Sequence, residues 1–154
     1  MSRPSAPRNP PPEIRIANRQ RALRVDLARI RRIVRAALPL CLAERGPLPP
    51  VLQKLAKVEV AIVSPSAMSR AHLEFLGIEG PTDVITFPYG EIVVCAAIAF
   101  ENAARYAAAP DDELALYIIH GLLHLNGFDD LTPARARNMR ARQAKILKAA
   151  RRSS

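Results

Sequence analysis

Four stretches of the chain either alternate apolar and polar residues or run apolar, and both patterns are typical of β-strands. Ile14 and Ile16 alternate with polar neighbours in the first stretch. The second stretch begins as an alternation and ends as an apolar run, which indicates a strand partly buried on both faces. The predicted strands are residues 13–19, 58–63, 81–87 and 92–98.

Apolar positions three or four residues apart predict five helices. Ser64 is the expected N-cap of the second helix, and Thr132 with Pro133 opens the last one. Prolines between residues 40 and 50 predict a loop after the first helix. The predicted helices cover residues 25–38, 67–75, 99–109, 111 to the turn at 127, and 133 to about 150.

The order of these elements predicts the fold class. Most strands are followed by a helix, but two strands are adjacent in the middle of the chain. We therefore expect an α/β fold, an α+β sandwich in which a mixed sheet of about four strands packs with about five helices. The last helix has only a weak apolar stripe, so we expect it to dock loosely or to stay free for RNA.

The 154 residues are enough for one domain that buries its own core without disulfides. Five of the fourteen prolines lie in residues 1–12, which we expect to be a disordered tail before a single domain at residues 13–150. No apolar run approaches the ~18 residues of a membrane span, and no secretory leader is visible, so we expect a cytoplasmic protein. Cys41 and Cys95 are then expected to be reduced thiols.

The net charge of +9 is unevenly distributed. Residues 1–40 hold ten Lys/Arg against two acids, residues 41–134 hold five against twelve, and residues 135–154 hold eight against none. Two basic segments thus flank an acidic middle, an arrangement that favours a polyanion such as RNA as the partner. The candidate RNA-binding residues on the first and last helices are Arg29, Arg32, Arg135, Arg137, Arg140 and Arg142.

Two of the three histidines, His120 and His124, lie four residues apart near the end of a predicted helix. On a helix this spacing puts both imidazoles on one face, where they can reach one metal ion. Gly127 allows the chain to turn and to bring Asp129 or Asp130 back toward the pair. Two histidines and one carboxylate leave a position for water, as in catalytic zinc sites. Alternatively, the two rings are core residues that bind backbone carbonyls.

The run from His120 to Asp130 resembles the H-G-x-L-H-L-x-G-(aromatic)-D-H signature of the YbeY endoribonucleases. Residues 81–88 resemble the P-T-D-V-L-S-F-P segment of the same family, and residues 90–92 its G-D-I segment. The resemblance covers about residues 14–131. It implies a metal-dependent, single-strand-specific endoribonuclease that acts in ribosomal RNA maturation, with the metal site in a cleft beside the sheet. It also implies one zinc or other divalent ion, small-subunit ribosomal RNA as a partner, and a ribosomal protein or a GTPase as a further partner.

The sequence departs from the family pattern at two positions. Asp130 stands where the family has its third ligand histidine, and a carboxylate is an ordinary zinc ligand. Leu76 stands where the family has an arginine, and leucine cannot bind a phosphate as a guanidinium does. We therefore expect the metal ligands His120, His124 and Asp130. The acid/base or supporting candidates are Asp129, Asp83 and Glu91, with Asp129 expected to hydrogen-bond a ligand histidine.

Two other functions fit parts of this pattern. A non-catalytic ribosome-assembly or RNA-binding factor with a structural metal is favoured by Leu76. A zinc metallopeptidase would share the His, His and Asp ligands, but Gly121 occupies the position of the general base in H-E-x-x-H proteases.

Overall fold

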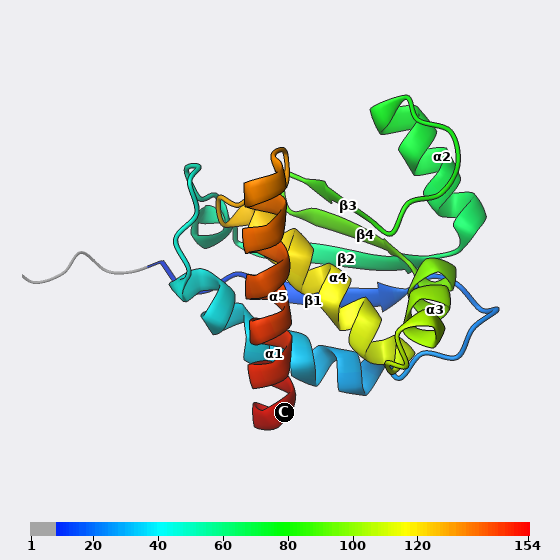
Figure 1. Cartoon of the computed structure of the whole chain (residues 1–154), viewed down its shortest axis with the longest axis horizontal. Helices are drawn as coiled ribbons and strands as arrows, with labels where there is room; N and C mark the ends of the chain where they lie inside the picture. The colour runs from blue at the N-terminus through cyan, green and yellow to red at the C-terminus, as the bar shows by residue number, and fades with distance from the viewer. Residues whose placement is uncertain (1–8) are drawn as a thin grey trace, which may run out of the picture.

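The computed structural model describes residues 9–154 and contains one four-stranded sheet and five α-helices. Figure 1 shows the helices α1, α4 and α5 gathered on one side of the sheet and α2 on the other. The expected α/β architecture is confirmed. Most of the expected tail, residues 1–8, lies outside the described residues, and residues 9–12 form no regular element. None of the helices within residues 9–154 combines the length and the apolar character needed to cross a membrane.

The strands are β1 (Glu13–Asn18), β2 (Lys57–Val63), β3 (Val84–Phe87) and β4 (Glu91–Cys95), in the spatial order β1-β2-β4-β3. β1 pairs in parallel with β2, and β2 in parallel with β4, whereas β3 is antiparallel to β4. The sheet is therefore mixed, as predicted. β3 is an edge strand, and its inner side chains face the helix that carries the two histidines.

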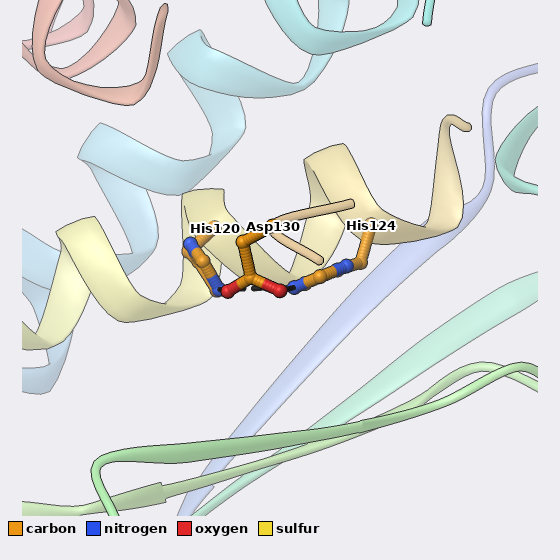
Figure 2. A group of neighbouring side chains, drawn as sticks. All are labelled: His120, His124 and Asp130. Carbon is orange, nitrogen blue, oxygen red and sulfur yellow. Dashed lines mark hydrogen bonds and ion pairs between the residues drawn. The ribbon is translucent and has the colours of Figure 1, made fainter. Parts of the chain in front are cut away.

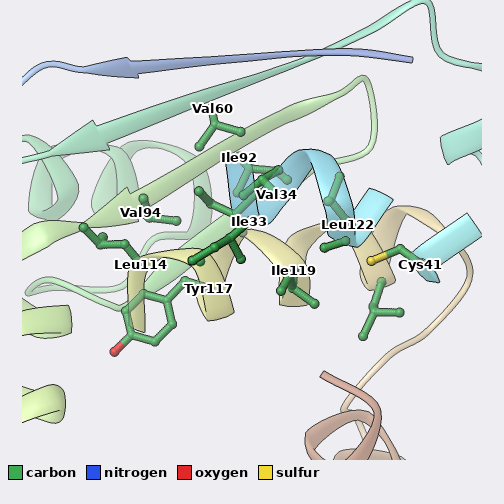
Figure 3. Packing of buried hydrophobic residues seen from close by; sticks show 14 of the residues in the cluster. Ile33, Val34, Cys41, Val60, Ile92, Val94, Leu114, Tyr117, Ile119 and Leu122 are labelled. Carbon is green, nitrogen blue, oxygen red and sulfur yellow. The ribbon is translucent and has the colours of Figure 1, made fainter. Parts of the chain in front are cut away.

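The helices are α1 (Leu27–Ala43), α2 (Pro65–Leu76), α3 (Ala96–Arg105), α4 (Pro110–Leu125) and α5 (Pro133–Ser153), and a 3-10 turn spans Leu52–Lys54. The larger core cluster joins one face of the sheet to α1, α4 and α5, and Figure 3 shows part of it. A smaller cluster on the opposite face joins β3 and β4 to α2. Because α4 lies between the sheet and the helices α1 and α5, it is buried on most sides.

Several element boundaries differ from the predictions. α1 continues through Pro39 to Ala43 instead of ending at residue 38, because the fully buried Cys41 extends the apolar stripe of Val34 and Leu38 by one turn. Pro39 itself is exposed on the outer side. β4 ends at Cys95 rather than at residue 98, because a helical stripe of buried alanines begins at residue 96. The third strand spans only four residues, Val84–Phe87.

The expectation that the last helix docks loosely was wrong. Met139, Ile146 and Ala150 are buried and join the main core cluster. Ile146 and Ala150 follow Met139 by about two and three helical turns, so the three residues share one helix face. These few apolar residues are enough to pack α5 against α1 and α4.

Candidate metal centre

α4 carries both histidines at a point where the helix is otherwise surrounded by core. The first turn of α4 contains Pro110 and three acidic residues, and the positive end of the helix dipole stabilises their carboxylates. Leu114, Ile118 and Leu122 of this helix are fully buried. His120 and His124 are half-buried, one turn apart, on the side that this core leaves open.

A tight turn after α4 returns the chain toward the histidines. Gly127 has a φ of +94°, and a Cβ there would lie 2.3 Å from the carbonyl oxygen of Leu48, so both its conformation and its space require glycine. The buried side chain of Asn126 donates from Nδ2 to the carbonyls of Cys41 and Glu44 at 2.8 and 2.9 Å. The end of α1 therefore anchors the turn that presents Asp130.

The structure brings His120, His124 and Asp130 together, as Figure 2 shows. Their ligand atoms all lie within 4.8 Å of one another. The two Nε2 atoms are 3.0 Å apart, and the carboxylate oxygens of Asp130 lie 3.7 Å from Nε2 of His120 and 3.9 Å from Nε2 of His124. Ligands about 2.0–2.1 Å from a tetrahedral zinc ion are separated by roughly 3.3–3.4 Å. The observed separations bracket that value.

Hydrogen bonds at the opposite ring nitrogens fix the tautomer of both histidines. Nδ1 of His124 donates to the carbonyl oxygen of Phe128 at 3.0 Å, because a carbonyl can only accept. Nδ1 of His120 donates to Oε1 of Gln143, on α5, at 2.7 Å. Both Nε2 atoms therefore present lone pairs to each other at 3.0 Å. Two lone pairs at this distance repel unless a cation lies between them, so the donor set fits a divalent metal.

The pKa of His124 lies below its ordinary value, mainly because burial disfavours the charged ring and secondly because His120 adds like charge. Asp130 opposes this shift. The imidazole of His124 therefore stays neutral down to a lower pH than that of a free histidine. The neutral imidazole is the form that binds a metal.

Asp129 forms its hydrogen bonds with groups other than the histidines, although it is adjacent to Asp130. Its Oδ2 accepts from Nη1 of Arg135 at 2.7 Å, and its Oδ1 accepts from the backbone N–H of Leu131 at 3.1 Å. The expected hydrogen bond between Asp129 and a ligand histidine is not formed. Gln143 and a backbone carbonyl take that role instead, and no local sequence pattern links position 143 to position 120.

The other two carboxylate candidates lie away from the pocket beside the histidines. Asp83 accepts from the backbone N–H of Val84 at 2.8 Å and from the hydroxyl of Thr82. Glu91 accepts from the Tyr89 hydroxyl at 2.9 Å. Because successive strand residues point to opposite faces, Glu91 lies on the face opposite to its neighbour Ile92, which packs against α4. Leu76 is exposed at the end of α2.

The candidate RNA-binding arginines fall into two groups. Arg29 pairs with Asp112 at 2.8 Å, Arg135 with Asp129, and Arg142 with Glu44. The others are exposed and have no carboxylate partner within the described residues; they are Arg32, Arg137 and Arg140.

A pocket of about 350 Å³ opens beside the two histidines. One wall comes from the loop before the 3-10 turn and the other from β3 and the residue after it. Both histidines, Phe128 and Asp129 line it at the metal side.

Comparison with known proteins gives a consistent family. The family model described as Endoribonuclease YbeY matches residues 15–151. The protein named Endoribonuclease YbeY from Frankia casuarinae is 34% identical over 113 residues, which cover 60% of this chain and 56% of that protein. The one from Protochlamydia amoebophila is 33% identical over 129 residues, which cover 77% of this chain and 79% of that protein.

The solution structure of TM1509 from Thermotoga maritima is similar in fold. It has a TM-score of 0.56 and 26% sequence identity, and the match covers 89% of this chain and 88% of that one. For the first three curated relatives, the chain spans only 56%, 57% and 64% of the length of the protein that it matches.

Proposed function

Because the chain belongs to the YbeY family, we propose that it is a metal-dependent endoribonuclease that cleaves single-stranded RNA. The observation that carries this proposal is the convergence of two Nε2 lone pairs and a carboxylate beside an open pocket. The relatives' name supports RNA as the substrate class. The family resemblance supports ribosomal RNA of the small subunit, processed in the cytoplasm with a ribosomal protein or a GTPase as partner.

The chain supplies three ligands to one zinc ion: His120, His124 and Asp130. Three protein ligands leave a fourth position, which is typical of catalytic zinc. When bound, zinc supplies Lewis acidity toward a phosphodiester and toward a water molecule.

Neighbouring residues orient the two histidine rings and place a positive charge, the Arg135 guanidinium, near the site. The Gln143 amide and the Phe128 carbonyl hold the two rings with Nε2 facing inward. Asp129 accepts a hydrogen bond from one nitrogen of the Arg135 guanidinium. Within residues 9–154 the other guanidinium donors have no hydrogen-bond partner, so they can bind a phosphate.

The decisive experiment compares His124→Ala with His72→Ala in metal-loaded protein. His72 lies on α2 and bonds the Gly80 carbonyl through Nδ1, so its loss leaves the metal ligands intact. We expect His124→Ala to lose both zinc and cleavage of unstructured RNA, and His72→Ala to retain both. Undiminished cleavage by His124→Ala would refute the proposed mechanism.

A second function is favoured by the exposed Leu76 at the family's arginine position. In that case the protein binds ribosomal RNA without cutting it, and its metal is structural. Tight binding to small-subunit RNA with no cleavage in zinc, manganese or magnesium would favour this function over the nuclease. A metallopeptidase gains no support, because Gly121 is buried against Ile92 and Thr86 and leaves no room for a general base.

A further inference from the structure

The pocket beside the metal ligands is mostly apolar, although a site that acts only on a charged backbone has no need of an apolar wall. One wall is formed by a short proline-rich loop and the other by the outermost strand of the sheet. Apart from the residues at the metal side, these walls are formed chiefly by Leu48, Pro49, Val51, Val84, Thr86 and Pro88.

Backbone hydrogen bonds hold the proline-rich wall in place. The N–H of Leu48 donates to the Gly127 carbonyl at 3.0 Å, and the N–H of Val51 donates to the Leu125 carbonyl at 2.8 Å. The loop thus runs beside the turn that presents Asp130. The pocket is built before any ligand arrives, and its wall is fixed relative to the metal ligands.

We propose that this pocket is a subsite that receives one unpaired nucleobase of the RNA, adjacent to the phosphate held at the metal ligands. This inference rests on the proposed function and adds the part of the substrate recognised beside the reacting phosphate. A volume of about 350 Å³ is at the lower end for small-molecule sites, so it suits one planar ring system rather than a base pair. Leucine, valine and proline side chains match the apolar faces of a base.

One side chain on the wall can read the edge of such a base. The hydroxyl of Thr86 has no hydrogen-bond partner in the part of the chain that the structure describes, and a hydroxyl can both donate and accept. By contrast, Asp129 already bonds Arg135 and the N–H of Leu131. The hydroxyl lies close to Gly121, where a Cβ would come within 2.9 Å of it, so that glycine keeps room for Thr86.

The same geometry restricts the substrate to unpaired RNA. In an A-form duplex each base is stacked and paired, so its faces are not available to a pocket wall. A base must leave the stack to enter, and this costs least where it is already unpaired.

Binding can be tested with an introduced fluorophore, because the chain contains no tryptophan. Leu48→Trp places one at the pocket wall, and the matched control Leu73→Trp places one on α2, which packs on the opposite face of the sheet; both leucines are exposed. Metal-loaded protein is mixed in stopped flow with a short oligouridylate or with an abasic sugar–phosphate oligomer of equal length and charge. We expect saturable quenching only for Leu48→Trp with the base-containing oligomer. Equal signals with both oligomers, or no signal at Leu48→Trp, would overturn the inference.

Cleavage gives an independent readout. An abasic residue is placed in turn at each position around the preferred cleavage site of a short RNA. We expect the abasic residue to lower kcat/KM by about tenfold or more at one position only, as for the loss of one base–protein contact. We also expect Thr86→Val to alter which base is preferred at that position. If RNA is cut but no position shows this loss, the subsite is refuted and the nuclease stands. If no RNA is cut but Leu48→Trp is quenched as expected, the subsite stands and the nuclease falls.

Discussion

Each metal-site histidine has a hydrogen-bond acceptor of its own at Nδ1, and the two acceptors differ in kind. The acceptor for His124 is the backbone carbonyl of Phe128, which the turn after α4 brings next to that ring. The acceptor for His120 is the side chain of Gln143, which comes from a different helix, α5. The orientation of His124 is therefore set by local backbone geometry, and that of His120 depends on how α5 docks.

Replacing Gln143 is expected to weaken zinc binding. Gln143→Leu removes the acceptor for Nδ1 of His120, and the loss of such a supporting bond typically lowers metal affinity by roughly 10–100-fold. Gln143→Glu keeps an acceptor at the same position and should keep most of the affinity. Competition with a chromophoric chelator measures both variants. Equal zinc affinity in Gln143→Leu and the parent chain would show that the bond does not orient the ligand.

Cys41 is expected to make the folded protein sensitive to alkali. Burial, followed by the nearby Glu44, raises its pKa from 9.0 to about 12. Between these values the unfolded chain has released the proton and the folded chain still holds it. Raising the pH therefore favours unfolding, by about 1.4 kcal/mol per pH unit for one such group.

Denaturant unfolding of the parent chain and of Cys41→Ala, measured between about pH 9 and 11, tests this linkage. The alanine variant is less stable throughout because of the lost packing, but its free energy of unfolding should fall less steeply with pH. Parallel curves for the two proteins would contradict a raised thiol pKa.

At the scale of elements, α4 lies close against the sheet at Gly121. A Cβ at this position would lie 2.8 Å from Cδ1 of Ile92 and 2.9 Å from Oγ1 of Thr86. The glycine thus sets the depth at which α4 rests on β4 and β3, and with it the position of the two histidines relative to the pocket wall.

Gly121→Ala is expected to destabilise the fold despite alanine's better helix propensity. Propensity alone would add about 1 kcal/mol, but overpacking typically costs about 1–3 kcal/mol. Ile92→Val removes the nearest methyl group, so it should cost less in the Gly121→Ala background than in the parent chain. Chemical denaturation of the four proteins measures this coupling. Additive effects would mean that α4 shifts freely and that the contact does not fix its position.

The elements that could be predicted from sequence are those whose signal is local. Period-two alternation and the 3.6-residue repeat located the four strands and five helices. The His120–His124 spacing and the glycine turn pointed to three side chains that the fold does bring together, and their role as metal ligands stays a prediction. The errors arose where tertiary contacts decide. Pro39 lies inside α1 because the burial of Cys41 favours one more turn, and Gln143 reaches His120 across 23 positions. A contact between residues so far apart in the sequence leaves no trace in the local pattern of apolar and polar residues.

At the scale of the whole molecule, part of the charge segregation in the sequence cancels in the fold. Asp112 accepts from Arg29 at 2.8 Å and lies 3.5 Å from Arg151, so one carboxylate of the acidic middle joins the two basic segments. Arg142 likewise pairs with Glu44, 98 positions away. These arginines hold α1, α4 and α5 together, a role that composition alone cannot distinguish from RNA binding.

RNA affinity should therefore depend on the arginines that the fold leaves unpaired. The double variant Arg137→Gln/Arg140→Gln removes two exposed charges from one face of α5. Each lost phosphate contact with a single strand should lower the slope of log Kd against log salt concentration by about 0.7, or roughly 1.4 for both.

The control Arg29→Gln/Arg142→Gln removes the same charge from residues paired with Asp112 and Glu44, so it should lower the free energy of unfolding more and the salt slope less. Binding titrations of a fluorescent single-stranded RNA across a range of salt concentrations compare the two. A larger change of slope in the control would assign the RNA contact to the arginines that the fold pairs internally, and RNA would then have to compete with Asp112 and Glu44 for them.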